Sequence, residues 1–178
     1  MPQILPTIFA KVQYNNTMPT PFQHVVYALD LLHPAAAVVA EEISRFPTLP
    51  MEIRQILTEH QGAFMLGNTG VDVQAITKQP RRDTHFYHLP PSRSPRAWQN
   101  MLAQYPSLRD PRTLAPDHAT FISGYFTHLV YDELWAWEIF VPFYMDSDLW
   151  PDRITRIIHH NALRVILDRQ AQDILTRH

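Results

Sequence analysis

Cysteine is absent from this 178-residue chain, which excludes disulfides, thiolate catalysis and cysteine-rich zinc fingers. Glycine is scarce, with four residues, and neither Gly-rich hairpin signals nor runs of alternating apolar and polar residues occur. The sequence therefore predicts a fold without strands, and any metal ion would have to be held by histidine and carboxylate side chains.

The chain also lacks a strong excess of one charge and a long apolar run. Its formal net charge is -2, and its positive charges are arginines except for Lys11 and Lys78, so no broad field attracts nucleic acid. No stretch approaches the roughly 18 apolar residues that span a bilayer. The amino terminus lacks the basic start and apolar core of a secretory signal. We expect a cytoplasmic protein without a transmembrane segment.

What is present indicates a folded chain. Hydrophobic residues make up 46% and aromatic residues 11% of the sequence, which argues against disorder. The length suits one domain with a substantial core. Residues 1–17 are expected to be an irregular lead-in, and residues 18–178 a single helical domain.

Apolar periodicity and helix-start signals predict an all-α, single-domain bundle of about six to seven helices. Thr20-Pro21 and Ser94-Pro95 each combine a capping hydroxyl with a proline. Gly67 should end a helix, and residues 67–93 should form one long irregular loop, which in a compact domain is often functional. The predicted helices span residues 21–32, 34–46, 51–66, 95–105, 116–140 and 151–175.

Two of these helices carry further expectations. The helix at 116–140 is apolar nearly all round and should lie at the centre of the bundle. Trp135 and Trp137 on it are expected at the surface, where they could support a homodimer. The buried stripe of the last helix should consist of Ile154, Ile157, Ile158, Leu163, Ile166 and Leu167.

His128 and Asp132 lie four residues apart in the central helix, so both side chains share one face and could bind one metal ion. Such a pair often only stabilises a helix. An ionised aspartate in a helix that is apolar all round, however, needs a charged partner or a metal, because burying it alone costs several kcal/mol.

Three more candidate ligands lie upstream. His24 is on the apolar side of the first helix, where it could equally be a core histidine bonded to a carbonyl. Asp72 lies between two valines after the Gly67–Gly70 segment, where it could instead cap a turn. His85 has aromatic neighbours, and His88 competes with it three residues on.

The order His24, Gly-x-x-Gly-x-Asp72, Thr-His85-Phe and His128-x-x-x-Asp132 resembles the zinc-dependent phospholipase C family, from about Met18 to the last helix. That family shares its all-helical fold with the zinc-dependent single-strand nucleases. The resemblance implies that Asp72, His85, His128 and Asp132 hold one zinc ion and that His24 holds a neighbouring one. One to two Zn²⁺ ions are expected, with iron or manganese as alternatives.

The chain departs from the family pattern at a further metal site. Glu138 stands ten residues after His128, where the family has a histidine, and His160 is followed by Arg164 where the family has a glutamate. An arginine cannot ligate a metal. Glu138 and His160 remain candidates for a second metal, with His159 as a rival.

The resemblance implies a metal-dependent phosphoric-ester hydrolase in which a hydroxide on the metal attacks a phosphodiester. Asp72 is the candidate that orients or deprotonates the water. Arg81 and Arg82 could hold the substrate phosphate, or form a solvated basic turn. The expected substrate is a small phosphoester or a phospholipid headgroup, with no strong nucleic-acid signal.

Two alternatives stay open at this point. The chain could be a non-catalytic helical module that keeps a structural metal site, in line with its incomplete second site. It could also bind no metal, with Asp132 paired to His85 or His128 in a buried polar network.

Overall fold

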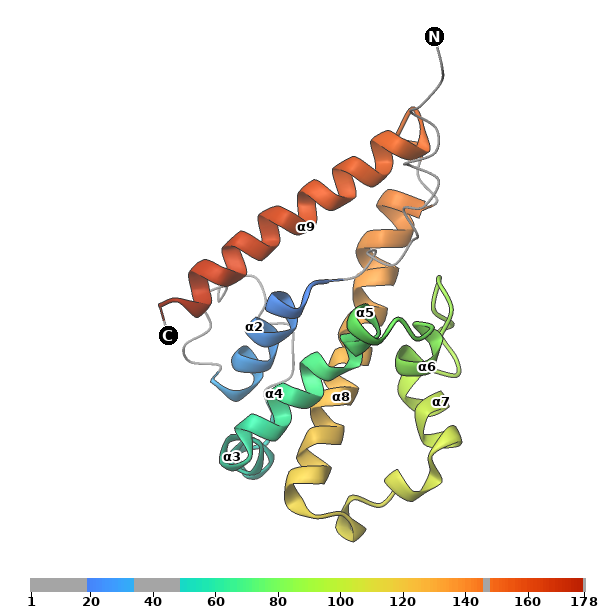
Figure 1. Ribbon diagram of the computed structural model, residues 1–178. Helices are drawn as coiled ribbons and strands as arrows, with labels where there is room; N and C mark the ends of the chain where they lie inside the picture. The colour runs from blue at the N-terminus through green and yellow to red at the C-terminus, as the bar shows by residue number, and fades with distance from the viewer. Residues whose placement is uncertain (1–18, 34–48, 146–147, 178) are drawn as a thin grey trace.

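A computed structural model describes residues 19–33, 49–145 and 148–177, and every regular element within these ranges is helical (Figure 1). The prediction of an all-α fold is thereby confirmed. The predicted lead-in at 1–17 and helix at 34–46 lie outside the described residues. The elements are α2 (Pro21–Leu32), α3 (Met51–Glu59), α4 (Gln61–Gly70), η2 (Val71–Val73), α5 (Gln74–Thr77), α6 (Arg82–His85), α7 (Ala97–Gln104), η3 (Pro106–Leu108), η4 (Pro111–Thr113), α8 (Pro116–Trp135), η5 (Ala136–Met145) and α9 (Arg153–Leu175).

The helix α8 is the centre of the fold, as its apolar sequence predicts. It packs most extensively on α4 and also contacts α2, α7 and η5 (Figure 1). Ile122 and Leu129 on α8 are buried in the main core cluster. At Trp135 the helix passes directly into η5, a wider π-helical segment that contains Pro142. The predicted helix at 116–140 therefore continues to Met145 in a different helical geometry.

The crossing of α4 and α8 requires two glycines. A Cβ atom at Gly67 would lie 2.0 Å from the carbonyl oxygen of Phe121, and one at Gly124 would lie 2.1 Å from the carbonyl oxygen of Phe64. The two backbones thus touch where neither residue carries a side chain. The prediction that Gly67 ends a helix is wrong, because this glycine serves helix packing and α4 continues to Gly70.

The connection after α4 is more ordered than predicted. The single helix expected at 51–66 is divided at His60, whose backbone is not helical (φ -113°, ψ 34°) and whose Nδ1 lies 2.6 Å from Asp117 Oδ1 of α8. Within the predicted loop at 67–93 the structure has the end of α4, then η2, α5 and α6. Only the part after α6 is irregular over a longer stretch.

The start of α7 is capped by a residue that lies far away in the sequence. Glu133 of α8 is fully buried, and its carboxylate accepts hydrogen bonds from Arg96 Nε at 2.6 Å and from the backbone N–H of Ala97 at 2.7 Å. The backbone N–H of Arg96 donates to Gln99 Oε1 at 2.7 Å. These contacts place the start of α7 at Ala97, two residues after the predicted start, because the cap comes from α8.

We expect Glu133→Gln to lower the free energy of unfolding by about 2–3 kcal/mol, since an amide cannot accept both hydrogen bonds and leaves a buried donor unpaired. Urea unfolding followed by circular dichroism would measure this loss. The exposed Asp173→Asn exchange on α9 is the matched control and should change stability by less than about 0.5 kcal/mol. Equal stability of the two variants would contradict the capping role of Glu133.

The helix α9 is confirmed, but its predicted buried stripe is only partly correct. Ile154, Ile158 and Ile166 are 54%, 59% and 54% exposed, whereas His160 and Ala171 are buried. The reason is that, among the described elements, α9 has extensive contacts only with α2 and η5. Neither α9 nor any other helix of the described ranges is both long and apolar enough to cross a bilayer.

The two tryptophans of the predicted dimer surface lie in different environments. Trp135 is 7% exposed and packs in a core cluster with Ala136 and Phe140, so its predicted surface position is wrong. Trp137 is half-buried, and its Nε1 donates to the carbonyl oxygen of Pro91 at 2.9 Å. The expectation of a homodimer therefore loses Trp135 as support.

Candidate metal centre

The five predicted ligands come together where α2, η2, α6 and α8 meet. His24 comes from α2, Asp72 from η2, His85 from the last position of α6, and His128 and Asp132 from successive turns of α8. Four of these side chains are at most 1% exposed, and Asp72 is 19% exposed. Segments separated by up to about a hundred residues thus place imidazoles and carboxylates in one buried cluster.

The spacing of the ligand atoms suits a shared cation. His85 Nε2 and His128 Nε2 are 3.3 Å apart, and they lie 3.3 Å and 3.5 Å from Asp132 Oδ2. Asp72 Oδ1 is 3.4 Å from His85 Nε2. Four atoms placed tetrahedrally at about 2.0–2.1 Å from zinc are about 3.3 Å from one another. Charge-assisted hydrogen bonds are shorter, at about 2.7–2.9 Å.

Neighbouring groups turn the Nε2 atoms of both histidines toward this cluster. His128 Nδ1 lies 2.7 Å from the carbonyl oxygen of Asn68, and because a carbonyl can only accept, Nδ1 carries the hydrogen. His85 Nδ1 lies 2.8 Å from Thr84 Oγ1, whose own hydrogen can go to Gln74 Oε1 at 3.3 Å. Metal-bound histidines are usually oriented by such a bond at the other ring nitrogen.

His24 lies beside this cluster, at a neighbouring position. Its ring stacks on that of His128, with centroids 3.7 Å apart, and its Nε2 is 3.4 Å from Asp132 Oδ1. Within the described structure, neither ring nitrogen of His24 nor Asp132 Oδ1 has a hydrogen-bond partner. Leaving buried polar atoms unpaired is costly. Ligand atoms of His24, Asp72 and His128 also lie within 4.8 Å of one another, so they could hold a second ion.

The two arginines predicted for phosphate binding lie in different places. Arg81 is directed into the cluster: its Nη2 donates to Asp132 Oδ2 and to the hydroxyl of Tyr87, and its Nη1 is 3.7 Å from Asp72 Oδ1. Arg82 is 65% exposed beside Asp83. Of the two, only Arg81 is close to the candidate ligands.

Burial and the neighbouring charges shift the pKa values of the groups in the cluster. Burial alone would raise the pKa of Asp132, but His128 and Arg81 hold it well below its usual range. Burial lowers the pKa of His24, and it lowers that of His85 to about 4. His128 differs, because Asp132 outweighs the effect of burial and raises its pKa. A proton on His128 and a metal ion would therefore compete for the same nitrogen.

The candidate second site does not come together in this way. Glu138 is exposed on η5, while His160 is buried among the rings of Tyr144, Phe140 and Trp135, at centroid distances of 4.7, 5.2 and 6.2 Å. Neither residue belongs to a group of three or more converging ligand atoms in the described part of the chain. His159, the rival, is exposed.

Sequence reasoning missed the residues that orient the ligands. Thr84 and Tyr87 lie next to His85 in the sequence, and Tyr87 donates to Asp132 Oδ2 at 3.2 Å. Between them Phe86 adopts a left-handed conformation (φ 58°), which is unfavourable for a bulky residue and turns the chain at the end of α6. The Thr-His-Phe-Tyr run was visible in the sequence, but the left-handed turn was not.

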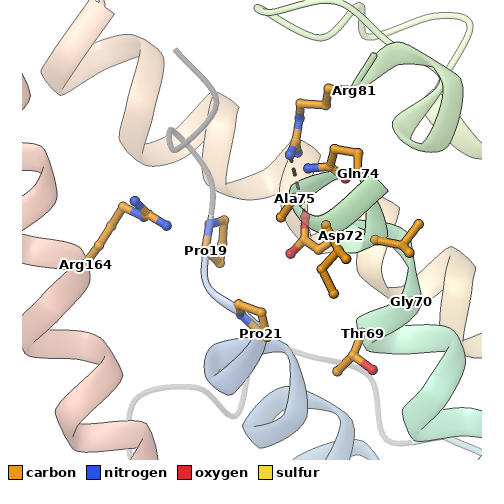
Figure 2. A pocket seen from close by; sticks show the side chains of 11 residues that line it. Pro19, Pro21, Thr69, Gly70, Asp72, Gln74, Ala75, Arg81 and Arg164 are labelled. Atoms are coloured by element: carbon orange, nitrogen blue, oxygen red, sulfur yellow. Dashed lines mark ion pairs between the residues drawn. The ribbon is translucent and has the colours of Figure 1, made fainter. Parts of the chain in front are cut away.

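A pocket of about 360 Å³ opens beside the cluster, on the side of Asp72 (Figure 2). Asp72 is the one candidate ligand in its wall, and Arg81 and Arg164 are its two cationic side chains. The complete lining is Pro19, Pro21, Thr69, Gly70, Asp72, Val73, Gln74, Ala75, Ile76, Arg81 and Arg164.

Comparisons of the chain with protein-family models, with curated proteins and with solved structures found no match. The similarity to the zinc-dependent phospholipase C family therefore depends on the ligand order in the sequence and stays an expectation.

Proposed function

We propose that the chain is a metal-dependent hydrolase of phosphoric esters, with zinc as the expected ion and with phospholipase C as the type of enzyme it resembles. The observation that supports this most is the convergence of His24, Asp72, His85, His128 and Asp132, with histidine nitrogens directed at carboxylate oxygens at tetrahedral spacing. Histidine and carboxylate ligands suit zinc and, less selectively, iron or manganese.

A divalent ion in this cluster would lower the pKa of a coordinated water to about 7 and polarise a phosphoryl oxygen. The proposal gives Asp72 the role of acting on that water, because it is the one candidate ligand that also lines the pocket. Burial raises the pKa of Asp72, but its contact with His85 and the charges of His128 and His24 together outweigh this effect and lower the pKa. An ionised Asp72 can orient a water molecule and accept its proton.

The pocket favours a small substrate over a polymer. Its volume of about 360 Å³ is at the lower end of ligand pockets, which hold molecules of drug size or smaller. Arg81 lines it and offers a guanidinium that suits a phosphoryl oxygen. A small phosphoester or a phospholipid headgroup is therefore the proposed substrate.

The second candidate function is that of a non-catalytic helical module with a structural ion. In the described part of the chain neither Glu138 nor His160 belongs to a group of converging ligand atoms, which favours this function because a second metal there would lack ligands. A closed four-ligand ion would indicate structure, and an open coordination position would indicate catalysis.

Elemental analysis of the untagged chain, followed by hydrolysis of bis(4-nitrophenyl) phosphate with and without added zinc, tests the proposal. We expect zinc-dependent hydrolysis, and we expect Asp72→Asn to lower the rate per bound metal by about 100-fold or more, as loss of a general base does. The control is Asp83→Asn, which changes a 52% exposed carboxylate and should leave the rate unchanged.

The other outcomes separate the alternatives. Stoichiometric metal without hydrolysis of this or of natural phosphodiesters would favour the structural module. Absence of metal after growth and purification with supplied zinc would contradict both functions.

A further inference from the structure

Arg164 of α9 lies on the opposite side of the pocket from the candidate metal centre. In Figure 2 its side chain extends from α9 toward Pro19, while Asp72 and Arg81 lie across the pocket on η2 and next to α6. The pocket therefore lies between α9 and the segment that carries the candidate ligand Asp72. Sequence reasoning regarded Arg164 only as a residue that cannot bind metal.

Two cationic side chains and one carboxylate line this pocket. Its charged lining consists of the guanidinium groups of Arg81 and Arg164 and the carboxylate of Asp72. The Oδ1 atom of Asp72 lies 3.4 Å from His85 Nε2 and 3.7 Å from Arg81 Nη1. A second carboxylate, that of Asp168, lies one turn after Arg164 on α9. Burial lowers the pKa of Arg164, and the Arg81 charge also lowers it while Asp168 and Asp72 raise it. Because both guanidinium groups line one pocket, an anion bound there could contact both and offset the repulsion between them.

One hydrogen-bond donor of Arg81 has no partner among the described residues. Its Nη atoms contact Asp132, Tyr87 and Asp72, but its buried Nε has no partner within the described structure. Guanidinium groups present several donors in a plane that matches tetrahedral oxyanions.

We propose that Arg164 and Arg81 bind the phosphoryl group of a small ester in this pocket, with its phosphorus atom next to Asp72. The choice of a phosphoryl group as the ligand rests on the proposed function. The placement between the two guanidinium groups rests on the pocket. Arg164 then selects an anionic substrate, and it reaches the site from a helix that contributes no candidate ligand to the centre.

Calorimetric titration of the full chain with inorganic phosphate, after removal of metals with a chelator, tests the site without any turnover. We expect saturable binding and a loss of at least about tenfold in affinity in Arg164→Gln, because a charge-assisted contact is removed. The control is Arg169→Gln, which removes the same charge from an exposed position of α9 outside the pocket lining and should bind as the wild type does. Melting temperatures would verify that both variants fold.

Further titrations identify the source of the phosphoryl group. Glycerol 3-phosphate represents a soluble ester, and vesicles that contain phosphatidate represent a lipid headgroup. Arg164-dependent binding to either supports the site and names its ligand. Phosphate binding that is absent in the wild type, or equal in Arg164→Gln, would overturn it.

Failure of this site can be distinguished from failure of the proposed function. If the wild type hydrolyses phosphodiesters with zinc and Arg164→Gln keeps the same KM, the phosphoryl site is wrong and the function stands. If phosphate binding depends on Arg164 but zinc never supports hydrolysis, the hydrolase is wrong and the anion site stands.

Discussion

Replacing Asp132 by alanine is expected to remove bound metal and to lower the free energy of unfolding by about 3–5 kcal/mol, the cost of breaking a buried charged pair. Asp132 is fully buried and faces His24, His85 and His128 at 3.3–3.5 Å as well as Arg81. The variant leaves a buried guanidinium and three imidazoles without their central carboxylate. Metal per chain by elemental analysis and urea unfolding would measure the two effects.

The same experiment separates the metal site from a metal-free polar network. At a free metal concentration of 100 times the dissociation constant, metal binding stabilises the folded wild type by about 2.7 kcal/mol. A chelator should remove this stabilisation. It should have no effect on Asp132→Ala, which has no metal to lose. A wild type that keeps its full stability in chelator while Asp132→Ala is destabilised would support the network without metal. The exposed Asp173→Ala exchange is the control and should behave as the wild type in both measurements.

Gly67→Ala is expected to destabilise the fold by at least about 3 kcal/mol, through overpacking that the helix crossing cannot absorb. The added Cβ would lie 2.0 Å from the backbone oxygen of Phe121 and 3.0 Å from the backbone nitrogen of Tyr125. Both atoms belong to α8, so the helices α4 and α8 would have to separate. Because His128 on α8 is held by the carbonyl oxygen of Asn68 on α4, metal affinity should fall as well.

Gly62→Ala is the matched control in the same helix. A Cβ there meets nothing within 4 Å, and alanine favours a helix by up to about 1 kcal/mol over glycine. The two exchanges should thus change stability in opposite directions, as thermal or urea unfolding would measure. A mild effect at both positions would mean that α4 and α8 do not approach as closely as the structure has them.

The ligand types and the helical class could be predicted from the sequence because both have local signals. A spacing of four places His128 and Asp132 on one helix face whatever the rest of the chain does. Apolar neighbours predict burial for His24, and burial means that a charged or polar side chain needs a partner. The absence of cysteine limits a metal to histidine and carboxylate ligands. These arguments need no knowledge of how the helices cross.

The tertiary structure alone decided which distant groups meet. From the sequence Arg81 could be a residue of a solvated basic turn, and its contact with Asp132 depends on how the start of α6 lies against α8. The cap of α7 by Glu133 and the role of Gly67 depend on helix crossings that local periodicity does not encode. Burial of α9 was overestimated because an apolar stripe predicts a buried face, whereas actual burial requires a neighbouring element along its whole length. The sequence by itself determined the helices and the chemistry of the ligands, and the crossing of α4 with α8 decided how these ligands face one another.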